Sequence, residues 1–180
     1  MVVVKHACLG YHMAKPQPNH NQVDTEIEGA SMDRLFVVEN ARERERLRTL
    51  VARMTDEDLR LPLEEGWTIA AALAHLAFWD QRALVLLRKC KKSGVAPSPM
   101  DIDTTNDALL VLCLALSPRV AANLAVSSAE TIDGELEKAS PELIAEIEGL
   151  GEKWRLYRSE HRKLHLDEIE HFLQARHGTN

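Results

Sequence analysis

Apolar residues recur at helical spacing along most of the chain, in segments that are separated by capping residues and prolines. The first predicted helix spans residues 34–54. Arginine alternates with glutamate on its polar side, and its apolar side consists of Leu35, Val38, Leu47, Leu50 and Val51. A second predicted helix begins after the N-cap residue Thr68 and runs to about Lys92. Because this segment is apolar nearly all round, we expect it at the centre of the fold.

The second half of the chain shows the same helical pattern. Ser117-Pro118 and Ser140-Pro141 each place an N-cap residue before a proline in the first helical position, so each pair marks the start of a helix. The approximate bounds of the predicted segments are 105–116, 118–138, 140–149 and 153–176. No strand pattern stands out. The sequence therefore predicts an all-α fold, a bundle of four long helices with an extra short helix.

Residues 1–31 are a different kind of sequence. They contain prolines, histidines and amides without a sustained helical period, and their apolar run is too short for a signal peptide. We predict that residues 1–31 form a flexible, disordered leader. Residues 32–180 then form one helical domain.

Composition narrows the function classes. The chain has 180 residues, of which 45% are hydrophobic, so it is large enough for one domain with a substantial core. Its net charge of −6 argues against a nucleic-acid surface. No uninterrupted apolar run approaches the roughly 20 residues of a membrane span. Three widely spaced cysteines imply no disulfide framework, which favours a reducing cytoplasm.

The last predicted helix contains an H-x-x-x-H pair, His161 and His165, followed by the carboxylate of Glu168. Side chains four apart on a helix are about 5–6 Å apart at Cβ, so two imidazoles at this spacing can converge on one metal ion. On a helical wheel these three residues share a stripe with Trp154, Tyr157, Leu164, Ile169 and Phe172. The pair therefore faces the core, where an unpaired polar group is costly and a bound metal would account for it.

A third histidine, His75, lies on the central helix beside small alanines. Three protein ligands with open positions are the pattern of a catalytic metal site, although a core histidine is more often simply hydrogen-bonded. Asp80 is a candidate partner that orients a ligand imidazole or, alternatively, pairs with an arginine. Glu168 is a candidate hydrogen-bond acceptor for a ligand imidazole, a fourth ligand or a general base. Trp67 and Trp79 are expected to pack in the core rather than to line a substrate site.

Three segments of the chain resemble the DinB-like (YfiT-like) metalloenzyme superfamily. Residues 66–80, GWTIAAALAHLAFWD, are similar to its second-helix signature, and residues 160–169, EHRKLHLDEI, to its last-helix signature of H-x-x-x-H followed by L-x-x-I. Residues 103–109, DTTNDAL, resemble the start of its third helix. The resemblance covers about residues 32–177. It implies an up-down-down-up four-helix bundle in which His75, His161 and His165 hold a metal ion.

Two function classes follow. The first is a divalent-metal-dependent enzyme that acts on a small molecule, either a hydrolase or a transferase or isomerase that uses a low-molecular-weight thiol, as some members of the superfamily do. Zinc is the first candidate metal, with nickel, iron and manganese as alternatives. The second is a non-catalytic stress or partner-binding module with a structural or vestigial site. A pocket with polar groups beside the histidines would favour the enzyme. We also expect a homodimer, and neither nucleic-acid nor membrane partners.

Overall fold

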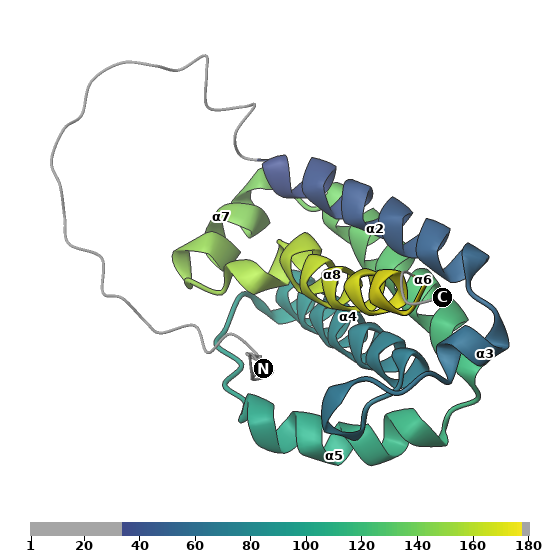
Figure 1. Cartoon of the computed structure of the whole chain (residues 1–180). Helices are drawn as coiled ribbons and strands as arrows, with labels where there is room; N and C mark the ends of the chain where they lie inside the picture. The colour runs from purple at the N-terminus through teal and green to yellow at the C-terminus, as the bar shows by residue number, and fades with distance from the viewer. Residues whose placement is uncertain (1–33, 178–180) are drawn as a thin grey trace, which may run out of the picture.

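The computed structural model describes residues 34–177, which fold into helices joined by short connections (Figure 1). The α-helices are α2 (Leu35–Arg53), α3 (Asp56–Leu59), α4 (Ile69–Ser93), α5 (Ile102–Ala115), α6 (Pro118–Glu137), α7 (Pro141–Gly149) and α8 (Arg158–His177). Two 3-10 turns, η1 (Glu64–Gly66) and η2 (Lys153–Arg155), precede α4 and α8. No strand occurs in this part of the chain, so the all-α prediction is confirmed. The predicted leader, residues 1–31, lies outside the described residues.

The four long helices α2, α4, α6 and α8 form the bundle (Figure 1). Asn40, near the start of α2, bonds to Leu156 just before α8 and to Ser159 in its first turn, and Arg46, further along α2, contacts Glu170, further along α8, so these two helices run in the same direction. Gln81 of α4 bonds to Ser128 of α6, and α4 and α6 run together in the opposite direction. The helix order is up-down-down-up, as the resemblance implied, with α5 returning the chain from the end of α4 to the start of α6.

Local capping sets most of the helix boundaries. The hydroxyl of Thr68 accepts the backbone N–H of Ala71 and starts α4, and Pro118 occupies the first turn of α6. The last helix begins later than the pattern predicts, at Arg158 rather than near Lys153. In between, η2 turns the chain so that Arg155 and Leu156, adjacent in sequence, are both buried.

The central helix α4 is buried on most sides, as the sequence predicts. By length and composition alone α4 could cross a membrane, with a mean hydropathy of 1.2 over its most apolar window, but 72% of that window is buried inside the bundle. α5, α6 and α8 pack against α4. The apolar side chains of α4 are thus explained by its place at the core of a helical domain.

A layer of polar side chains crosses the middle of the bundle and separates two apolar clusters. One cluster surrounds the first half of α4, and the other surrounds its second half. The polar layer consists of Asn40, Asp80, Asp133, Arg158 and Arg162, all buried. Arg162 is fully buried and is bound by both carboxylates, Asp80 at 3.0 Å and Asp133 at 2.9 Å.

The polar layer explains where the predicted core faces were wrong. Leu35 and Val38 of α2 are 51% and 67% exposed. The predicted Leu47, Leu50 and Val51 are buried, but in the first half of α2 the buried side runs through Phe36, Asn40 and Glu43. Leu164 of α8 is likewise 44% exposed, because the arginines of the polar layer take up the core-facing side of that helix.

Candidate metal centre

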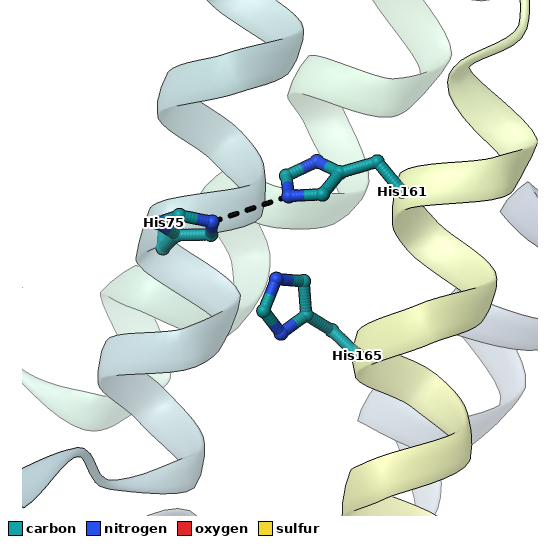
Figure 2. A group of neighbouring side chains, drawn as sticks. All are labelled: His75, His161 and His165. Atoms are coloured by element: carbon teal, nitrogen blue, oxygen red, sulfur yellow. Dashed lines mark hydrogen bonds between the residues drawn. The ribbon is translucent and has the colours of Figure 1, made fainter. Parts of the chain in front are cut away.

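The antiparallel helices α4 and α8 bring His75, His161 and His165 together (Figure 2). One nitrogen from each ring lies within 4.8 Å of the others. His161 and His165 are one turn apart on the face of α8 that meets α4, and His75 projects toward them from α4. The three candidate ligands predicted from the sequence therefore form one cluster, and a small closing movement of the rings would let their nitrogens bind a single ion at about 2.0–2.1 Å.

The closest approach in the cluster is between Nε2 of His75 and Nε2 of His161, 3.2 Å apart. Two imidazole lone pairs facing each other at this distance repel, so a proton or a cation must lie between them. Burial, followed by the neighbouring His165 and Arg158, holds the pKa of His161 well below its usual value of 6.5. His161 is therefore neutral at neutral pH, the state in which an imidazole can bind a metal.

His165 provides the most direct test of whether the cluster fits a metal ion. Its side chain is buried, and neither of its ring nitrogens has a hydrogen-bond partner in the protein. Nδ1 lies 3.6 Å from Oε2 of Glu168, and the other ring nitrogen points at the His75–His161 pair (Figure 2). A buried imidazole without partners is costly, and coordination through this nitrogen would remove that cost. Three imidazole nitrogens that converge on one point, one of them on a ring without hydrogen-bond partners, fit a divalent ion.

The two acidic candidates have different surroundings. Glu168 faces Nδ1 of His165, in the position from which a carboxylate can orient a ligand imidazole. Asp80 binds arginines: Oδ1 accepts from Nε of Arg158 at 2.9 Å, and Oδ2 from Nε of Arg162 at 3.1 Å. Arg158 in turn places Nη2 3.5 Å from Nδ1 of His161. Asp80 therefore does not contact the histidine cluster directly and is connected to it through Arg158.

Aromatic rings enclose His75. The rings of Trp67 and Trp79 meet it edge to face, with centroids 5.4 and 6.1 Å away. Trp79 is buried, as expected for a packing residue, and its Nε1 donates to Oδ1 of Asn106 at 3.2 Å. Trp67 is half-buried and also lines a pocket, which the sequence-based expectation of a pure packing role does not include.

This pocket has a volume of about 220 Å³ and lies between the segment before α4, α5 and the histidine cluster. His75 and His165 form part of its wall. The other lining residues are Leu63, Glu65, Trp67, Ala72, Asp103, Asn106, Asp107 and Leu110. Two candidate ligands thus border a space that a small molecule can enter.

Sequence reasoning missed the arginines of the polar layer. Arg158 and Arg162 are four residues apart, and each lies within a turn of the histidine pair on α8. That spacing places them beside the histidines on the core-facing side of α8, so the sequence alone could have indicated that the two arginines are buried. Their carboxylate partners come from other helices, which no local pattern reveals.

Cys90 and Cys113 are buried free thiols.

Comparison with known proteins supports the same architecture. No curated protein and no solved structure matches the chain. The family model of the DinB superfamily matches residues 39–173, a span that contains nearly all of the bundle core and all three clustered histidines. The chain therefore belongs to the DinB superfamily.

Proposed function

We propose that this protein is a metal-dependent enzyme that acts on a small molecule, with His75, His161 and His165 as the metal ligands. The observation that carries the proposal is the position of the cluster: its nitrogens converge within 4.8 Å, and two of the three rings border a pocket of about 220 Å³. Polar side chains, including Asn106, line the same pocket. A sealed cluster would instead have favoured the non-catalytic module.

Three protein ligands leave coordination positions open for a substrate or for water. A divalent ion there supplies a Lewis acid that activates water or a thiol, or polarises a carbonyl. The chain's own residues do the positioning. The carboxylate of Glu168 lies 3.6 Å from Nδ1 of His165, a position from which it can orient that ring, and Trp67 and Trp79 cover one side of His75 with edge-to-face contacts. The side chain of Asn106, whose Oδ1 accepts from Nε1 of Trp79, lies in the wall of the same pocket.

Within this proposal the reaction is a hydrolysis, or a transfer or isomerisation that uses a low-molecular-weight thiol. Zinc is the first candidate because three imidazoles with an open site suit it, while nickel, iron and manganese accept the same donors. The free thiols of Cys90 and Cys113 agree with a reducing cytoplasm as the place of action.

Metal analysis is the decisive experiment. Protein purified without a histidine tag should contain about one zinc, nickel, iron or manganese ion per chain, or take one up after chelation. Ester, amide and thiol-transfer substrates are then assayed in the metal-free and reloaded protein. The proposal predicts an activity that disappears with the metal and returns with it. Failure to bind any of these ions tightly would refute the proposal. Tight binding without an open position for an exogenous ligand would favour the structural site.

A further inference from the structure

The pocket beside the histidines has an acidic mouth. Its charged lining residues, apart from the histidines, are Glu65, Asp103 and Asp107, and no lysine or arginine is among the ten residues that line it. All three carboxylates are exposed, so they face solvent at the entrance. A molecule that enters therefore passes a concentration of negative charge before it reaches His75 and His165.

Ordered elements hold these carboxylates in place. Asp103 and Asp107 are one turn apart on α5, so their side chains lie on the same face as the pocket-lining Leu110. The N-cap Asp101 fixes the start of α5 by accepting the backbone N–H of Thr104 at 3.0 Å. Two of the three carboxylates of the acidic mouth are thus part of a helix, and the third, Glu65, lies in the 3-10 turn η1.

The inner end of the same pocket has an independent sign of a ligand. His165 is only 6% exposed, and its ring nitrogens have no hydrogen-bond partner in the protein. The pocket thus combines an inner end that needs an electron-pair acceptor with an outer end that attracts positive charge. A volume of about 220 Å³ is below the roughly 300–1,000 Å³ of drug-sized ligand sites, so the two ends act on one small molecule.

We infer that the pocket selects small molecules that carry an ammonium or similar cationic group at the mouth and a metal-binding oxygen or sulfur at the inner end. This inference rests on the proposed function, because the metal at the three histidines holds the inner group. Molecules with a carboxylate at the mouth are disfavoured by the same charges. If the reaction uses a thiol, an amine-bearing thiol is preferred over one that carries several carboxylates.

Three hydroxamates of matched length test this inference: β-alanine hydroxamate with an ammonium end, butyrohydroxamate with a neutral end and succinic monohydroxamate with a carboxylate end. All three bind a metal through the same head group. Their affinities are measured from the visible spectrum of the cobalt-substituted protein, which reports ligand binding without any activity. We expect the ammonium probe to bind about tenfold more tightly than the carboxylate probe at low salt, with the neutral probe between them. The preference should shrink at high salt, because the carboxylates are exposed.

The double variant Asp103→Asn/Asp107→Asn should reduce the preference to about twofold while keeping the affinity for the neutral probe. The matched control Glu146→Gln/Glu148→Gln removes the same charge from α7, which contributes no residue to the pocket, and should keep the full preference. Equal affinity of the wild type for the charged probes, or a preference that survives the Asp103/Asp107 change, overturns the inference while leaving the metal site intact. A protein that forms no cobalt site at all overturns the proposed function and this inference with it.

Discussion

Asp80 and Arg158 form an ion pair inside the bundle, with 2.9 Å between Oδ1 and Nε and neither side chain more than 3% exposed. The guanidinium reaches beyond the carboxylate toward Nδ1 of His161. The pair thus connects the polar layer to the histidine cluster. A buried pair of this kind is costly to break, because the remaining charge is left without compensation.

Replacing Asp80 by alanine should therefore lower the free energy of unfolding by about 3–5 kcal/mol. Urea denaturation of the metal-free protein measures this loss without any contribution from metal binding. A loss below about 1 kcal/mol would show that the two arginines do not need this carboxylate, and that the polar layer contributes little to the stability of the fold.

Glu168 should behave differently, because it faces an imidazole rather than a guanidinium, and its side chain is 32% exposed. In Glu168→Gln we expect the metal affinity to fall about 10–100-fold, as is usual when a group that orients a ligand imidazole is changed. The unfolding free energy of the metal-free protein should change by less than about 0.5 kcal/mol, as for most surface substitutions. Competition with a metal-binding dye measures the affinity. An unchanged affinity would remove Glu168 from the site.

Asp133 and Glu137 of α6 provide a matched pair, because both contact Arg44. Asp133 is 2% exposed and also binds Arg162, whereas Glu137 is 44% exposed. Asp133→Ala should cost about 3–5 kcal/mol of stability and Glu137→Ala less than about 1 kcal/mol. The urea concentrations at half unfolding of the two variants compare these losses, provided that the dependence of the unfolding free energy on urea concentration is unchanged. Similar losses would mean that burial does not distinguish these ion pairs.

His161→Ala and His165→Ala should each abolish tight metal binding with little loss of helical structure, because apolar packing stabilises the bundle. His171→Ala is the control, since His171 is exposed on the same helix and outside the cluster. Saturating metal should stabilise the wild type and His171→Ala by about 2.7 kcal/mol when free metal exceeds Kd about 100-fold. The same metal concentration should not stabilise His161→Ala or His165→Ala. Metal-dependent stabilisation of His165→Ala would exclude that residue as a ligand.

The apolar surface of α5 is where we expect a homodimer to form. Only Cys113 is buried in this helix, while Val111 and Leu112 are 70% and 65% exposed. Such exposed apolar surface is typical of a protein interface. We expect sedimentation to show a dimer for the wild type and a monomer for Val111→Lys/Leu112→Glu. Val38→Lys, at a similarly exposed valine of α2, should remain dimeric. A monomeric wild type at micromolar concentration would contradict the expectation.

Signals within single helices predicted much of this architecture. Thr68 and Ser140 cap their helices through hydrogen bonds that the sequence pattern indicates, and the H-x-x-x-H spacing placed His161 and His165 on one face. His75 was a candidate third ligand from its place on the central helix, but only the resemblance to the family supported joining it to the pair, since the sequence separation of 86 residues contains no geometric information.

Hydrophobic periodicity failed where polar residues occupy the core. It cannot tell a fully buried Arg162 from an arginine that extends to solvent, because the difference depends on Asp80 and Asp133 on two other helices. It also cannot show that α5, the most apolar helix by composition, lies on the surface. Both properties depend on tertiary contacts that local patterns do not encode.

The separation of 86 residues between His75 and His161 also has a consequence for biosynthesis. During translation α4 emerges long before α8, so a nascent chain displays one histidine of the cluster without its two partners. The histidine cluster can assemble only after α8 has left the ribosome and docked on α4. Under the proposed function, metal insertion is therefore a late event, and a chain that stalls before α8 lacks two of the three proposed ligands.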